Sequence, residues 1–161
     1  DQHNAECRVY TFKEGLLSAV AHDLEIDVRR FEVSVADDDG PITGTFEMNS
    51  LVVLGAMADG RPAPGTLSDK DKKKIEGNIT SDVLSPKKHP TARFRSTEVS
   101  DSRIVGELEL NGRKKQIELR RDGNVVTATL HQPDFGIKPF SAMFGTLKIK
   151  PDVQIKLTLG G

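Results

Sequence analysis

Apolar and polar residues alternate along most of the chain. From Leu24 to Val28 the apolar residues are separated by acidic ones, and from Phe31 the alternation resumes on odd positions. Every second side chain of a strand points to the same face of a sheet, so this period predicts half-buried strands. The phase slips at residues 29–30, where a β-bulge would keep both halves facing inward, and slips again at residues 49–50.

Similar alternating runs, separated by turn signals, bring the expected number of strands to about eight. They lie within residues 8–13, 24–35, 42–53, 92–99, 104–110, 117–119, 126–130 and 147–159. Asn111-Gly112, Asp122-Gly123 and Asp39-Gly40 are typical of tight hairpin turns, because these residues tolerate a positive φ. We expect Pro151-Asp152 to close the last hairpin. The pattern predicts an all-β fold, a barrel of about eight antiparallel strands.

One segment has a helical period. Large apolar residues recur four positions apart from Ile75 to Val83, after a run at residues 68–71 that resembles an N-terminal capping box. We expect one amphipathic helix here, weakened at Gly77 and ending at Ser85-Pro86. The preceding residues 55–65 are rich in glycine and proline and predict a long loop.

A second departure from the strand pattern lies at residues 136–145. Pro139 suits the first position of a helix. Phe140, Met143 and Phe144 would then lie on one face of a single turn. We expect a short helical plug that caps one end of the barrel or lines a cavity.

Composition narrows the class of protein. The chain has 161 residues, enough for one domain over residues 1–161. Its 23 Lys+Arg and 24 Asp+Glu give a net charge of -1, which argues against nucleic-acid binding. A single cysteine, Cys7, excludes a disulfide-rich scaffold. The longest apolar run, residues 51–58, is too short for a membrane span. No export signal opens the chain, so we expect a cytoplasmic protein, or a periplasmic one if a signal peptide was removed.

Four stretches, in their order and spacing, resemble the YceI-like family of bacterial polyisoprenoid-binding proteins. They are residues 10–24, 79–96, 106–119 and 134–137, and the resemblance covers nearly the whole chain. It implies an eight-stranded antiparallel lipocalin-like barrel around a long apolar tunnel, holding an isoprenoid lipid such as a prenyl quinone or a prenyl phosphate. Residues 11–16 depart from the family pattern, because they predict a short helical turn where the family often has an extended strand.

We therefore expect a binding protein, not an enzyme. It would carry an isoprenoid or another long-chain amphiphilic lipid inside the barrel, with no cofactor and no metal. Small residues on the inner face, namely Gly44, Ala92, Gly106 and Ala128, would leave volume unfilled and so favour a cavity. The apolar candidates for contact with the lipid are Phe12, Leu24, Phe46, Phe94, Leu108, Leu130, Phe135, Phe140, Met143 and Phe144.

Three polar residues are candidates for the mouth of the tunnel. His22, oriented by the neighbouring Asp23, could donate to a quinone carbonyl or a phosphate oxygen. His131 lies at the end of a strand beside the plug. Lys138 could meet a phosphate head group.

Two other functions stay open. The first is a cavity-based enzyme or stress-response factor that uses His22, Asp23 and His131. Neither a Cys7–His22 pair nor a metal site of the two histidines with Asp134 has a local sequence signature. The second is a packed barrel that acts as an interaction module, with the loop at residues 55–65 as its contact surface. Under any of these functions, barrels of this kind could pair into a homodimer through exposed faces. An internal void would separate lipid binding from the packed barrel.

Overall fold

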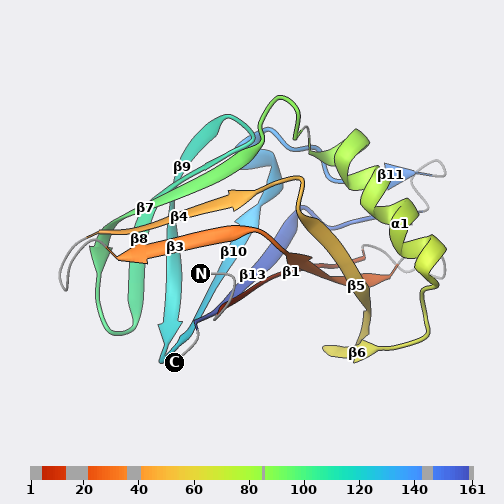
Figure 1. Ribbon diagram of the computed structural model, residues 1–161, viewed down its shortest axis with the longest axis horizontal. Coiled ribbons are helices and arrows are strands. Elements are labelled where there is room, and N and C mark those ends of the chain that lie inside the picture. Colours follow the sequence, from red (N-terminus) through yellow and green to blue (C-terminus); the bar gives the residue numbers. More distant parts are fainter. Residues whose placement is uncertain (1–4, 14–21, 36–40, 85, 143–146, 160–161) are drawn as a thin grey trace.

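The computed structural model describes residues 5–13, 22–35, 41–84, 86–142 and 147–159, which form one large antiparallel sheet with a helix beside it (Figure 1). The strands of this sheet are β1 (Ala5–Thr11), β2 (Asp23–Val28), β3 (Phe31–Val35), β4 (Ile42–Glu47), β5 (Leu51–Ala58), β6 (Arg61–Ala63), β7 (Thr91–Val99), β8 (Arg103–Leu110), β9 (Arg113–Asp122), β10 (Val125–His131) and β13 (Asp152–Leu159). The remaining elements are the pair β11 (Ser141–Ala142) and β12 (Leu147–Lys148), the helix α1 (Asp69–Asn78), the π-helical turn η1 (Ile79–Val83) and the 3-10 turn η2 (Gln132–Phe135).

The sheet has eleven strands in the order β3-β4-β7-β8-β9-β10-β13-β1-β2-β5-β6. The antiparallel all-β fold is thus confirmed, but a closed barrel of eight strands is wrong, because this order ends at β3 and at β6. The extra strands arise largely because two long strands break. The breaks lie between β2 and β3 and between β4 and β5, at the two phase slips of the sequence pattern.

Hydrogen bonds carry the strand ladder across these breaks. The Arg29 N–H donates to the Ser50 carbonyl over 3.0 Å, and the Glu47 N–H donates to the Arg30 carbonyl over 3.0 Å. The Ser50 hydroxyl adds a bond of 2.7 Å to the Glu47 carbonyl. The β2–β5 pair therefore passes into the β3–β4 pair through a bonded corner, which bends the sheet instead of ending it.

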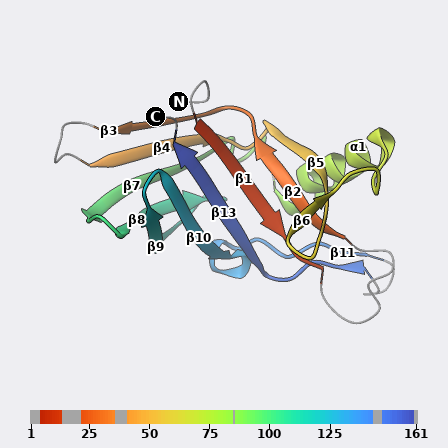
Figure 2. The same cartoon turned by 90° about the horizontal axis from the view of Figure 1, so that it is seen from below.

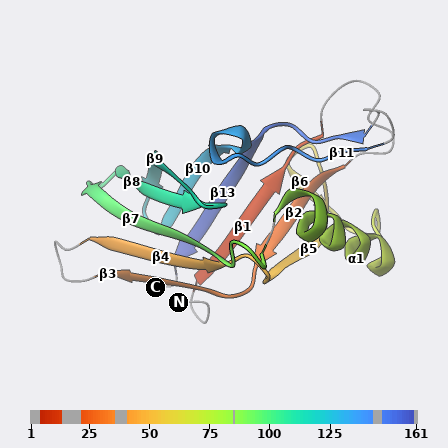
Figure 3. The ribbon, with the colours of Figure 1, turned by 90° about the horizontal axis from the view of Figure 1, so that it is seen from above.

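The bend of the sheet turns the inner face of β7 and β8 toward the inner face of β10. Figures 2 and 3 show β3, β4, β7 and β8 toward one end of the molecule, and α1 beside β2 and β5 at the other. Phe94 of β7, Leu108 of β8 and Leu130 of β10 belong to one hydrophobic cluster. The apolar face of each half thus points into a shared interior, as the two-residue period requires.

The predicted helix and its capping box are confirmed. The Asp71 N–H donates to the Ser68 hydroxyl over 3.1 Å, and the Ser68 N–H donates to the Asp71 carboxylate over 3.2 Å. The bond that the Ser68 N–H donates to the carboxylate, aided by the Ser68 side chain, holds the pKa of Asp71 below its ordinary value. After Asn78 the helix widens into η1, where the Thr80 hydroxyl donates back to the Gly77 carbonyl over 3.0 Å. None of the helices in the described ranges is both long and apolar enough to span a bilayer.

The prediction of a long loop at residues 55–65 is wrong. Strand β5 continues to Ala58, and β6 begins at Arg61. Asp59 and Gly60 connect them with φ values of 52° and 76°, the positive angles of a tight hairpin turn. Asn111-Gly112 forms the hairpin turn predicted for it, with φ values of 54° and 76°.

The prediction of a short helical plug at residues 136–145 is wrong in its position. The helical turn is η2, with Pro133 in its first turn and Gly136 ending it at a φ of 68°. Phe140 instead follows an irregular segment, and its carbonyl accepts a bond of 3.1 Å from the Ile149 N–H beside β11 and β12. Met143 and Phe144 lie outside the described residues, as do the Asp39-Gly40 turn and residues 14–16 of the helical turn expected at residues 11–16. The described half of that turn is extended instead, because Thr11 ends β1 and Lys13 forms a β-bridge with Ile149.

Pro151-Asp152 does not close a hairpin. Strand β12 pairs with β11, whereas β13 pairs with β10 and β1. The Pro151 carbonyl accepts a bond of 2.8 Å from the Gln132 N–H, which aligns the start of β13 with the end of β10. The proline thus leads the chain from one sheet into the other.

Candidate ligand-binding cavity

The two halves of the sheet enclose a cavity of about 1280 Å³. Its wall is formed by side chains of β1–β5, β7–β10 and β13, together with α1, η1 and η2. A solidly packed barrel does not fit this structure, because native cores rarely leave voids much larger than a water molecule.

Hydrocarbon dominates the inner wall. Its buried aliphatic members include Leu24, Ile26, Val28, Ile104, Leu108, Val126, Leu130 and Val153. The fully buried polar side chains on the described wall are Ser96 and Gln132. The Ser96 hydroxyl accepts the Ile42 N–H over 2.8 Å, and the Gln132 amide donates to the Lys150 carbonyl over 3.2 Å. Both therefore spend hydrogen bonds on the protein backbone. The Thr11 hydroxyl oxygen, also on the wall, is buried without a hydrogen-bond partner among the described residues, and the rest of the wall between the two ends is mostly apolar.

One end of the cavity is bordered by α1. Asp71, Lys74, Ile75, Asn78 and Ile79 all line it, and their spacing places them on one face of the helix. Ile75 and Ile79 also pack against the cluster formed by β2 and β5. The predicted apolar stripe therefore anchors the helix, while its polar neighbours face the end of the cavity.

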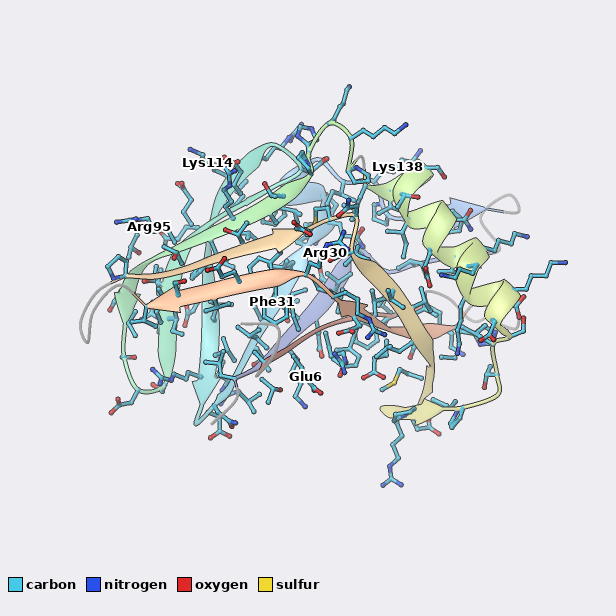
Figure 4. All side chains as sticks on the ribbon, in the orientation of Figure 1. Glu6, Arg30, Phe31, Arg95, Lys114 and Lys138 are labelled. Carbon is cyan, nitrogen blue, oxygen red and sulfur yellow. The ribbon has the colours of Figure 1, made fainter. Side chains whose placement is uncertain are left out.

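The other end reaches the surface where β3 and β7 terminate, at the left of Figure 1. Val35 and Val99 line the cavity and are nevertheless 57% and 44% exposed. Arg95 and Glu98, both exposed, also line this part of the wall. Figure 4 shows Arg95 at this end of the molecule.

The inner glycines do not leave empty volume, which corrects one argument from the sequence. A β-carbon at Gly44 would lie 2.8 Å from Cε2 of Phe46, and one at Gly106 would lie 2.5 Å from Cζ of Phe94. Each glycine is thus covered by a phenyl ring. The space for a ligand therefore does not come from the missing side chains of these two glycines.

Most of the predicted contact residues lie on the cavity wall. These are His22, Leu24, Phe46, Phe94, Leu108, Leu130, Phe135 and Phe140. His22 precedes β2, whereas Val35 ends the continuation β3, so the histidine lies toward the end opposite Val35.

Three predicted residues do not reach the cavity. Phe12 is half-buried outside its wall, and Lys138 is exposed (Figure 4). His131 points outward, with its Nδ1 2.6 Å from Oδ1 of Asp152. The next residue, Gln132, faces inward in its place. It continues the inward positions of β10, so the alternation itself could have identified it.

The structure does not bring His22, Asp23 and His131 together, as the enzyme alternative requires. Asp23 accepts the Lys13 N–H over 2.8 Å and does not line the cavity, while His131 lies on the outer face. Within the part of the chain that the structure describes, no three His, Cys, Asp or Glu side chains are placed to hold a metal ion.

Cys7 is a buried thiol on the cavity wall, and sequence reasoning did not select it as a site residue. Burial raises the pKa of this thiol to about 12; the Asp27 carboxylate adds to the rise, and the Arg8 guanidinium opposes it. Only the thiolate attacks alkylating reagents. The folded protein should therefore keep Cys7 unreactive near neutral pH.

We expect iodoacetamide to modify Cys7 of the folded protein about a thousandfold more slowly than an ordinary thiol at about pH 8. Because its pKa is raised, the rate should still climb about tenfold per pH unit near pH 10, where an ordinary thiol has levelled off. Mass spectrometry of timed samples measures the rate, and the urea-unfolded chain is the control. A plateau near pH 9 in the folded protein would contradict the raised pKa.

The chain was compared with known proteins. The YceI-like domain model matches residues 11–160. BcnA of Burkholderia cenocepacia has a TM-score of 0.66 at 16% identity, over 100% of this chain and 98% of that chain. A polyisoprenoid binding domain from Saccharophagus degradans, implicated in plant cell wall breakdown, has a TM-score of 0.55 at 9% identity, over 98% and 94%. The YCEI protein of Campylobacter jejuni has a TM-score of 0.59 at 11% identity, over 84% and 82%. No curated protein matches the chain by sequence.

Proposed function

Because this chain belongs to the YceI-like domain family, we propose that its cavity binds and carries an isoprenoid or another long-chain amphiphilic lipid. The observation that carries this proposal is the apolar wall around about 1280 Å³. Pockets for drug-sized molecules occupy roughly 300–1,000 Å³, so this cavity suits a single larger and more apolar molecule. The relative from Saccharophagus degradans, described as a polyisoprenoid binding domain, supports the same class of ligand.

Affinity would come from removing the lipid chain from water. Each buried CH₂ contributes about 0.8 kcal/mol, so affinity should grow with chain length until the cavity is filled. The inner wall is mostly apolar, and among the described residues the Thr11 hydroxyl is its buried side-chain group without a hydrogen-bond partner, so the wall selects mainly by shape and apolarity. A wall that selects by shape and apolarity favours binding over catalysis.

We place the polar head of the lipid at the α1 end. Lys74 and Asn78 of α1 line the cavity there, and His22 lies toward the same end. The opposite end carries the exposed Val35 and Val99, which suit a hydrocarbon tail, beside the charged Arg95 and Glu98. A head group with acceptor oxygens matches the donors that these three polar side chains offer.

Two variants on β10 test whether the cavity is the binding site. Ala128 lines the cavity, whereas Thr129, the next residue, is exposed on the outer face. Ala128→Phe should fill part of the cavity and weaken binding of a prenyl quinone by about tenfold or more, because lost burial of two CH₂ groups already costs that much. Thr129→Phe should leave binding unchanged.

The measurement is native mass spectrometry of freshly purified protein, followed by lipid extraction and titration with prenyl quinones and prenyl phosphates. Thermal unfolding checks that both variants fold. Absence of a co-purified lipid together with no binding in titration would refute the proposed function. Equal losses in the two variants would place the lipid outside the cavity.

A further inference from the structure

We infer that Gly44 determines the width of the cavity, and so the kind of lipid chain it admits, because its missing β-carbon leaves room for the edge of the Phe46 ring. This inference rests on the proposed function for its ligand and on the structure for its geometry. Both residues belong to β4 and line the cavity.

The sheet register puts large residues beside small ones in neighbouring rows. In one row Phe31 of β3 pairs with Phe46, which pairs with Ala92 of β7. In the next row Gly44 pairs with Phe94 of β7. The Phe46 ring leans from its own row over Gly44, where its Cε2 and Cζ would lie 2.8 Å and 3.1 Å from an added β-carbon.

A methyl group at position 44 would have to displace this ring. Non-bonded carbon atoms prefer separations of about 3.5–4.0 Å, so 2.8 Å is too close. The next nearest atom, Cγ2 of Val33, would lie 3.8 Å away and need not move. The clash therefore falls on Phe46 alone.

The displaced ring can move into the cavity. The Phe31 ring stacks on Phe46 with centroids 5.9 Å apart and planes inclined by 14°, and Phe31 is itself buried. A new β-carbon would push the Phe46 ring away from Gly44, and Phe46 lines the cavity. An alanine at position 44 would thus tilt the ring into the space that a lipid occupies.

Such a narrowing would discriminate between lipid chains. An isoprenoid chain carries regularly spaced methyl branches and is wider than an unbranched alkyl chain. A ring in the lumen would exclude the branched chain first. Hydrophobic pockets discriminate by about tenfold or more for one methylene-sized difference.

The test compares Gly44→Ala with the matched control Gly55→Ala, because a β-carbon at Gly55 meets nothing within 4 Å. Displacement of a fluorescent apolar probe measures the Kd of geranylgeraniol and of the unbranched hexadecanol. Gly44→Ala should weaken geranylgeraniol about tenfold and hexadecanol much less, and Gly55→Ala should change neither. Adding Phe46→Leu to Gly44→Ala should restore geranylgeraniol binding.

Equal losses of both alcohols in Gly44→Ala, or no loss of either, would overturn the inference. A crystal structure of Gly44→Ala decides the geometry independently, since a Phe46 ring that keeps its present position would also overturn the inference. If Gly44→Ala does not fold, Phe46→Leu alone should shift the binding preference from hexadecanol toward geranylgeraniol. An unchanged preference would overturn the inference. If the unaltered protein binds neither alcohol and no prenyl quinone or prenyl phosphate, the proposed function fails and the selectivity with it, while the ring position is still decided by the crystal structure.

Discussion

Replacing Phe135 with alanine should lower the free energy of unfolding by about 4 kcal/mol, the largest effect that we expect from one side chain. Phe135 is 1% exposed and is the largest fully buried side chain in the described residues. It belongs to the same cluster as Phe94 and Leu130, and its carbonyl accepts the Asn111 side-chain amide over 3.1 Å. Truncation removes the ring and enlarges a space that is already open, so the surroundings cannot readily collapse to fill it.

Urea denaturation of the variant measures this loss, with Phe140→Ala as the control. Phe140 also lines the cavity but is only half-buried, so its truncation should cost about 1–2 kcal/mol. Equal losses in the two variants would show that η2 is not the packing centre that we describe.

Replacing Gly106 with alanine should lower the free energy of unfolding by about 3 kcal/mol. An added β-carbon would lie 2.4 Å from the Arg95 carbonyl oxygen as well as 2.5 Å from Cζ of Phe94. The ring can turn aside, but the carbonyl belongs to the β7 backbone beside the register shift between Ser96 and Glu98. The substitution therefore strains the β7–β8 pairing itself, which distinguishes it from Gly44→Ala.

Gly55→Ala is again the control, and it should change the free energy of unfolding by less than about 0.5 kcal/mol. Both variants are measured by urea denaturation with the same slope, so that midpoints compare directly. A Gly106→Ala protein as stable as the control would mean that the strands separate at no cost, contrary to the contact described.

The sequence pattern predicts the strands well because alternation reports which face a side chain takes. The two phase slips coincide with the breaks at Arg29-Arg30 and at Ser50, and the capping box at Ser68 marks the helix start. Alternation does not report whether the space at the inner face of the sheet is filled by side chains or left open as a cavity. The count of strands and the absence of closure depend on those corners, which a local pattern cannot resolve.

The candidate site shows the same division. Inward positions such as Leu24 and Leu130 follow from alternation and do line the cavity. The chemistry of His131 predicts a site residue, but the histidine occupies an outward position of β10, where the structure pairs it with Asp152. The contact of the Phe46 ring with Gly44 depends on the side-chain rotamer of Phe46 and on the cross-strand register. Neither can be predicted from a local sequence pattern.

The open interior also means that the stability of this protein has no single value. About 1280 Å³ without protein atoms forgoes dispersion contacts that a filled core would make. Any molecule that enters only the folded form adds RT ln(1 + [L]/Kd) to the free energy of unfolding. The melting temperature would then report the supply of occupant as much as the sequence, and preparations with different occupancy would melt at different temperatures.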